Sequence, residues 1–235
     1  MDIEVLGGLH VRENGLPVVP AAPTARQILA VLAAYADQLV PATVLTGELA
    51  VHTPVEHTRT ALLDAVQQLR GLLAAATGPA GRRTPETVLV SVPGGYLLDS
   101  GGGRSDLHEF AREAGAGYRA MSRRDFETAA RRLSGALGLW RGPAFDGIAA
   151  GPRLADRIAG LERTRRSVLA QWVEAQLALG RHRELLAELR AAGAGRALET
   201  YPELAAVLGF DGSGHGRSPA DTTRAVRRTL LGGAA

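Results

Sequence analysis

The stretch Leu137-Gly138-Leu139-Trp140-Arg141-Gly142-Pro143-Ala144-Phe145 ends an alanine-rich amphipathic segment and opens a Gly-Pro turn. Apolar residues at helical spacing from Asp125 to Leu139 predict a helix before it. Proline lacks a backbone donor and restricts the residue before it, so Gly142 and Pro143 stop that helix. Towards the N-terminus, short alternating and helical patterns are mixed, and beyond the stretch the pattern is helical only. It therefore lies in the helical part of a chain that begins as α+β.

The bulk composition bounds the class of protein. The chain has 235 residues, 46% of them hydrophobic and 4% aromatic, so leucine, valine and alanine must fill the core. It has no cysteine, which excludes disulfides and thiolate chemistry. We find no basic leader and no apolar run long enough for a membrane span. We therefore expect a cytoplasmic protein with no membrane contact.

The charge is unevenly distributed along the chain. All 27 basic residues are arginine. Residues 1–100 carry six arginines against nine acids, a net −3, whereas residues 101–235 carry twenty-one against fifteen, a net +6. Phosphate neutralisation supplies much of the affinity of DNA-binding proteins. The acidic balance of the first part therefore requires segregated charges if that part binds DNA.

The first 50 residues predict three short strands followed by two helices. Apolar residues alternate over residues 2–20, with Gly7-Gly8 and Asn14-Gly15 as turns, which is typical of an antiparallel meander. Thr24 to Gln27 fits a capping box that opens a first helix. Residues 41–50 predict a short second helix.

A third helix and a terminal hairpin complete this part. Thr53-Pro54-Val55-Glu56 predicts a helix start, with Thr53 as the N-cap and Pro54 in the first turn. The helix should bury Leu62, Val66, Leu69 and Leu73, which lie four, three and four residues apart. Residues 88–98, with Pro93-Gly94-Gly95 as the turn, predict a hairpin. Three short helices followed by a hairpin predict a winged helix.

The linker Ser100-Gly101-Gly102-Gly103-Arg104 is the best domain boundary. We expect a winged-helix domain over 1–100 and a helical domain over 101–235. Helices are predicted over 106–121, 125–139, 154–179 and 184–192, with a last one near 221–231. Small and large residues alternate in them as in tetratricopeptide helix pairs, which stack around a concave face.

The ordered series of motifs resembles the Streptomyces antibiotic regulatory protein family. The resemblance covers about residues 1–190 and is carried by Arg26 before the first helix, by Val92-Pro93-Gly94-Gly95-Tyr96 in the wing, and most specifically by Leu139 to Ala144. It implies a response-regulator-type winged-helix DNA-binding domain joined to a bacterial transcriptional activation domain. Members usually continue with further helix pairs, so the C-terminal part is expected to be shortened.

The third helix departs from the family pattern. Of three arginines that members show there, the chain keeps only Arg70, and the tryptophan of the preceding loop is missing. Asp64 adds a negative charge to the face that would approach DNA phosphates, an unfavourable placement. If this helix enters a major groove, its outer face and the wing supply the contacts. The predicted DNA-binding residues are Arg59, Thr60, Gln67, Gln68, Arg70, Arg82 and Arg83.

Other chemistry is poorly supported by the sequence. His52, Glu56 and His57 lie close together, but a metal site needs three or four convergent ligands. The glycine pairs lack the lysine of a phosphate loop, and no nucleophile elbow is present. We predict no catalytic residue, no metal and no cofactor. Trp140 and Trp172 are interpreted as packing anchors.

Two hypotheses follow. The resemblance implies a transcriptional regulator, an activator of a secondary-metabolite (antibiotic biosynthesis) gene cluster. It would bind promoter DNA as side-by-side protomers and recruit RNA polymerase through its sigma factor. A second copy of the chain, forming a homodimer, and a small-molecule metabolite are further expected partners. The alternative is a family-derived protein that has lost DNA binding. Such a protein would hold a metabolite or a protein partner and could have acquired an enzymatic role in biosynthesis.

Overall fold

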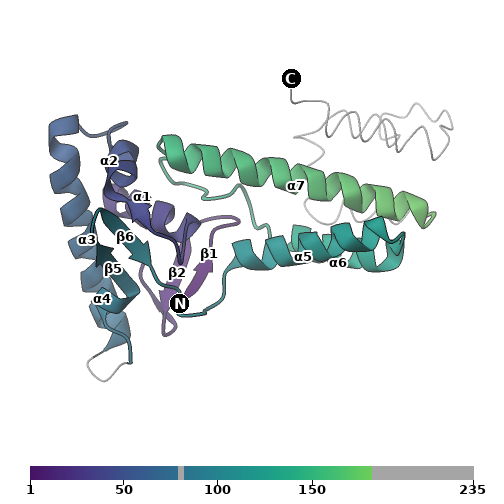
Figure 1. Ribbon diagram of the computed structural model, residues 1–235, viewed down its shortest axis with the longest axis horizontal. Helices are drawn as coiled ribbons and strands as arrows, with labels where there is room; N and C mark the ends of the chain where they lie inside the picture. The colour runs from purple at the N-terminus through teal and green to yellow at the C-terminus, as the bar shows by residue number, and fades with distance from the viewer. Residues whose placement is uncertain (79–81, 182–235) are drawn as a thin grey trace. The chain divides into compact units, whose positions relative to one another are not determined.

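The computed structural model describes residues 1–78 and 82–181 (Figure 1). The chain forms two units, which are described separately. The first contains Met1–Glu109 and Trp140–Glu162, and the second contains Phe110–Leu139 and the residues from Arg163 onward. The first unit is therefore built from two pieces of sequence. The sequence predicted two domains divided after residue 100. That division into domains stays a prediction.

The chain begins with the predicted meander. Strands β1 (Asp2–Glu4), β2 (His10–Glu13) and β3 (Leu16–Pro17) form an antiparallel sheet, with Ile3 opposite Val11. Both of these side chains are buried. Asn14 and Gly15 adopt positive φ angles of 49° and 81°, as the tight turn of a two-residue hairpin requires. The alternation of the sequence thus predicted this sheet correctly.

Four helices and a second sheet complete the first part of this unit. The second sheet has the order β4-β6-β5, so the hairpin lies beside a two-residue strand that the sequence did not predict. Leu45 and Leu49 on α2 and Val88 on α4 are fully buried. The elements are α1 (Pro23–Ala34), β4 (Val40–Pro41), α2 (Ala42–Leu49), α3 (Val55–Thr77), α4 (Pro85–Val88), β5 (Leu89–Val92) and β6 (Gly95–Leu98).

The predicted starts of two helices were wrong in detail. Helix α1 begins at Pro23 without a side-chain cap, because its N-cap residue is Ala22, which offers no side-chain acceptor. The amide of Gln27 donates to the backbone oxygen of Glu48, 2.9 Å away. Helix α3 begins at Val55, one residue later than expected, with Pro54 rather than Thr53 at the N-cap. Proline fixes the φ angle that a helix needs but offers no side-chain acceptor.

The stretch at 137–145 returns the chain to the first sheet. The backbone N–H of Arg141 donates to the oxygen of Leu6 at 2.7 Å, and that of Phe145 donates to the oxygen of Val5 at 2.9 Å. Phe145 is fully buried, and Trp140 is 8% exposed, as expected for a packing anchor. The Gly-Pro turn therefore does more than end a helix, because it lays residues 141–146 along the chain that leaves β1.

Two buried carboxylates hold this returning segment. Asp106 accepts the N–H groups of Val5 and Leu6 at 2.8 and 3.0 Å, and its Oδ2 atom also lies 2.9 Å from the guanidinium of Arg141. Glu48, 1% exposed, accepts the N–H of Leu154 at 2.9 Å in the first turn of α7 (Pro152–Ala178). Both carboxylates thus join segments about a hundred residues apart.

The contact between Glu48 and the start of α7 requires a glycine at position 151. A Cβ atom built on it would lie 2.7 Å from the backbone oxygen and 2.8 Å from the Cα atom of Glu48, distances that real contacts almost never show. Beside it, the guanidinium groups of Arg153 and Arg157 lie 4.8 and 5.7 Å from the ring centroid of Tyr35. These are cation–π distances. We name the contact between Glu48, Gly151 and Leu154 the α2–α7 joint.

Up to residue 181, where the described part of the chain ends, the second unit is helical. It contains most of α5 (Asp106–Ser122), α6 (Phe126–Gly138) and the part of α7 from Arg163 onward. Helices α5 and α6 approach closely where Gly117 faces Leu133, and Arg132 pairs with Glu113 at 3.1 Å. The α7 residues Val168, Trp172 and Ala175 are buried. The predicted helices at 184–192 and near 221–231 lie outside the described residues.

A cap fixes the start of α6. The carboxylate of Asp125 accepts the backbone N–H of Thr128 at 3.1 Å. This hydrogen bond lowers the pKa of Asp125, because it stabilises the ionised form. The residue pattern predicted the start of this helix at the same aspartate.

The fold class is confirmed at the level of small N-terminal sheets followed by a helical part. Of the helices in the described part of the chain, none has both the length and the apolar character that crossing a bilayer requires.

Candidate nucleic-acid interface

Helix α3 has two clearly different faces. Leu62, Val66, Leu69 and Leu73 are each 2–3% exposed and pack inward, as their spacing predicted. The opposite face is solvated over most of its length. Helix α3 lies beside the β5–β6 hairpin in the first unit, because Arg70 on α3 contacts Leu89 and Ser91 on β5 (Figure 1).

Four predicted contact residues share the solvated face of α3. Arg59 and Thr60 are exposed in its first half, and Gln67 and Gln68 are exposed two turns later. Asp64, between the two pairs, is exposed as well. Leu63 is half-exposed at 51%. We define the outer face of α3 as Arg59, Thr60, Leu63, Asp64, Gln67 and Gln68.

Arg70 is held against the hairpin. Its Nη2 atom lies 2.9 Å from Oγ of Ser91 and 3.3 Å from the backbone oxygen of Leu89, both on β5. The pKa of Glu86 is lowered by hydrogen bonds from its own backbone N–H and from the Thr84 hydroxyl, with the charge of Arg70 as a smaller cause. In the described structure, the guanidinium of Arg70 therefore links α3 to the hairpin.

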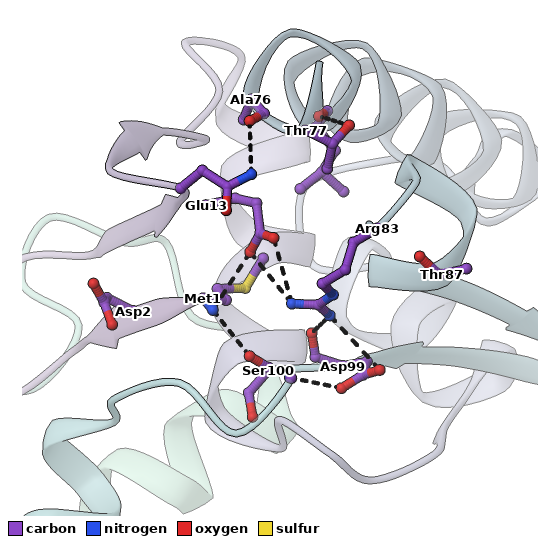
Figure 2. Close-up of polar contacts among 12 residues, drawn as sticks. Met1, Asp2, Glu13, Ala76, Thr77, Arg83, Thr87, Asp99 and Ser100 are labelled. Atoms are coloured by element: carbon purple, nitrogen blue, oxygen red, sulfur yellow. Dashed lines mark hydrogen bonds and ion pairs between the residues drawn. The ribbon is translucent and has the colours of Figure 1, made fainter. Parts of the chain in front are cut away.

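The two arginines before α4, Arg82 and Arg83, differ in whether they have partners within the unit. Arg82 is exposed, whereas Arg83 points inward between two acids (Figure 2). Its guanidinium lies 3.4 Å from the carboxylate of Glu13 and 3.6 Å from that of Asp99, and it also donates to the backbone oxygen of Asp99. The amino group of Met1 lies 3.4 Å from Glu13 on the other side. Glu13 itself is buried.

The structure thus separates the seven predicted residues into two groups. Arg59, Thr60, Gln67, Gln68 and Arg82 present free polar ends to solvent, while Arg70 and Arg83 have partners within the unit. Gly94, with a φ of 87°, makes the hairpin turn as predicted. Whether each residue contacts DNA stays a prediction.

Some important polar residues were not selected from the sequence. Asp106 and Glu48 look like ordinary helix acids, and only the fold shows that each holds a distant backbone N–H. The sole local signal is the Gly151-Pro152 pair before α7. His52, Glu56 and His57 are exposed, and no group of three or more possible metal ligands occurs in residues 1–78 and 82–181.

Comparison with known proteins identifies the class. Residues 105–196 match the model of the bacterial transcriptional activator domain. Over 191 residues, 81% of this chain, the sequence is 38% identical to the regulatory protein DnrI of Streptomyces peucetius, of which it covers 70%. It is 32% identical to the transcriptional regulatory protein EmbR of Mycobacterium tuberculosis, of which it covers 48%.

A solved structure agrees with the sequence matches. The structure of Mycobacterium tuberculosis EmbR in complex with a low affinity phosphopeptide superposes with a TM-score of 0.70 at 28% identity, and the match covers 98% of this chain and 64% of that one. The chain therefore spans about half to two thirds of the length of EmbR. The class defined by these matches is the bacterial regulators of transcription. Within it, the chain belongs to the Streptomyces antibiotic regulatory protein family.

Proposed function

We propose that this regulator activates a secondary-metabolite gene cluster by binding promoter DNA through the first unit. In this proposal, α1–α3 and the β5–β6 hairpin act as a winged helix, with α3 in the major groove and the hairpin as the wing. The observation that carries it is the outer face of α3, which is exposed and, apart from Leu63, polar, opposite a buried apolar stripe. Family membership supports the same assignment.

The contact residues then divide by role. Gln67 and Gln68 are suited to reading adenine, because a side-chain amide can form hydrogen bonds with both N6 and N7 of that base in the major groove. Arg59 and Arg82 are free to neutralise phosphates. Arg70 and Arg83 remain in the proposed set, and their internal partners give each a second role in holding α3 and the wing.

The second domain would contact RNA polymerase. We propose that residues 101–235 form a tetratricopeptide-like activation domain that recruits the polymerase through its sigma factor, and that protomers bind side by side as a dimer. A metabolite could act as an effector of this domain. The site of action is then the cytoplasm, where promoter DNA lies.

Fluorescence anisotropy of the purified chain against DNA tiled across its own gene neighbourhood tests the proposal. We expect submicromolar binding to one segment, with affinity that falls steeply between low and near-physiological salt. On that segment, Gln67→Ala and Gln68→Ala should relax base preference, and Arg70→Ala should weaken binding to every DNA. Weak, sequence-independent binding to all segments would contradict the proposal.

A further inference from the structure

The outer face of α3 carries an acid at its centre. Asp64 is exposed and lies opposite the buried stripe that contains Leu62 and Val66. Residues one helical turn away are its usual ion-pair partners, and here these are Thr60 and Gln68, both neutral. Within residues 1–78 and 82–181, no ion pair or hydrogen bond involves the Asp64 carboxylate.

This placement has an electrostatic cost on DNA. A carboxylate near phosphates is repelled, and no partner in the described part of the chain compensates the charge of Asp64. The centre of a helix face, however, reaches the base edges, while its flanks reach the phosphate backbone. A carboxylate at the centre is thus favourable only where a base offers it a donor.

Base chemistry restricts which donor this can be. An ionised carboxylate accepts hydrogen bonds and donates none. In the major groove, guanine and thymine present only acceptors, and adenine presents its amino group beside the acceptor N7. Cytosine alone presents its N4 amino group without a neighbouring acceptor.

We propose that Asp64 is a specificity-determining residue that accepts a hydrogen bond from the N4 amino group of a cytosine in the operator. The inference rests on the proposed function and deepens it. The proposal also fits the small number of arginines on this helix. With fewer positive charges to attract phosphates, the face selects its site in addition by rejecting wrong bases. Guanine or thymine opposite Asp64 leaves the carboxylate unpaired next to the DNA, and adenine places its acceptor N7 beside it.

The test uses the full chain and the DNA segment found by tiling, with every base pair permuted in turn. For the wild-type chain, we expect one G·C pair whose replacement lowers affinity about 10-fold. In Asp64→Ala this discrimination should fall below about 2-fold, and affinity for unrelated DNA should rise. Asp64→Asn should prefer adenine at the same position, because an amide pairs with adenine N6 and N7.

Two controls separate base reading from general charge effects. Glu56→Gln removes an equal charge from an exposed residue in the first turn of α3, so it should raise affinity for unrelated DNA and leave the base preference unchanged. Replacing the paired guanine by inosine removes only a minor-groove amino group, so wild-type affinity should stay the same.

The outcomes distinguish this inference from the function on which it rests. A wild-type chain that binds one segment specifically, with Asp64→Ala keeping every base preference, overturns the inference alone. Loss of the same preference in Glu56→Gln, or a tenfold effect of inosine, overturns it as well. A wild-type chain with no specific segment overturns the proposed function too. Because Asp64 is exposed, the variants should melt as the wild type does, which a thermal scan checks.

Discussion

The first unit contains two regions that use charge in opposite ways. On the outer face of α3, Arg59, Asp64 and their neighbours are exposed. In the region that receives residues 140–162, Asp106 and Glu48 are buried, and each accepts hydrogen bonds from a segment about a hundred residues away. Both regions contain acids that look alike in the sequence.

The difference separates the residues needed for folding from those available for recognition. Leaving a buried carboxylate without its donors, or buried N–H groups without their acceptor, lowers the free energy of unfolding by several kilocalories per mole. The residues of the second region are therefore constrained by stability. Exposed side chains on a helix can change at little cost to stability. The outer face of α3 is therefore free to be selected for its partner.

The strongest test of this contrast is Asp106→Ala. The substitution leaves the N–H groups of Val5 and Leu6 buried without an acceptor and removes one of the two carboxylates beside Arg141, leaving Glu4 at 3.4 Å. We expect the free energy of unfolding to fall by about 3–5 kcal/mol. Urea denaturation measures it. Glu109→Ala, which removes an ion pair between the half-buried Glu109 and the exposed Arg104, should cost less than about 1 kcal/mol.

The pH dependence of stability sharpens the same test. Burial raises the pKa of Asp106 above its ordinary 3.8, and the bonds from Leu6, Val5 and Arg141 offset this only in part. The folded chain then binds this proton more tightly than the unfolded chain, so the contribution of Asp106 to stability falls as the pH rises from 3.8 through the raised pKa. Wild-type minus Asp106→Asn unfolding free energies should show that decline. An increase over this range would mean that the donors outweigh burial.

Arg83 and Arg82 form a matched pair. Arg83→Ala removes the guanidinium beside the buried Glu13 and should cost about 1.5–3 kcal/mol. Arg82→Ala should change stability by less than about 0.5 kcal/mol and weaken binding to all DNA. Denaturation together with anisotropy separates the two effects. Equal stability losses in both variants would refute the contrast.

Gly151→Ala tests the α2–α7 joint. Its new methyl group overlaps the backbone of Glu48, so we expect a loss of about 1–3 kcal/mol. Gly47→Ala, the adjacent position in α2, faces open space and should instead stabilise the helix by about 0.5–1 kcal/mol. Two losses of the same size would show that the joint is not tight.

The smallest stability effects are expected on α3. Gln67→Ala and Gln68→Ala should each change the free energy of unfolding by less than about 0.5 kcal/mol, because both side chains are exposed. Their base preference on the tiled segment should change nonetheless, by about 1–3 kcal/mol for a lost bidentate contact. A stability loss above 1 kcal/mol would place them in the packed part of the unit.

Local patterns predicted most of the elements, and long-range contacts explain what they missed. The period of Leu62, Val66 and Leu69 predicted the buried face of α3, and the Asn14-Gly15 turn predicted the first hairpin. The docking of residues 141–146 on Val5 and Leu6 joins segments far apart in sequence, so no local pattern shows it.

The candidate interface was predictable in part for the same reason. The exposure of Gln67 and Gln68 follows from helix periodicity alone. The inward position of Arg83 depends on Glu13 and Asp99, and that of Arg70 depends on Ser91 in the next hairpin. Each partner comes from a different element, and an arginine in the sequence does not reveal which neighbour it meets.

The two-piece construction of the first unit has a consequence for its synthesis. Met1–Glu109 is synthesised before the piece that completes the unit, Trp140–Glu162. At the usual rate of chain growth, residues 110–162 take about 3–10 s to add. Until Arg141 and Phe145 have been added in this interval, the backbone oxygens of Leu6 and Val5 lack their later donors. The nascent regulator therefore passes through a stage in which its proposed DNA-reading unit is incomplete.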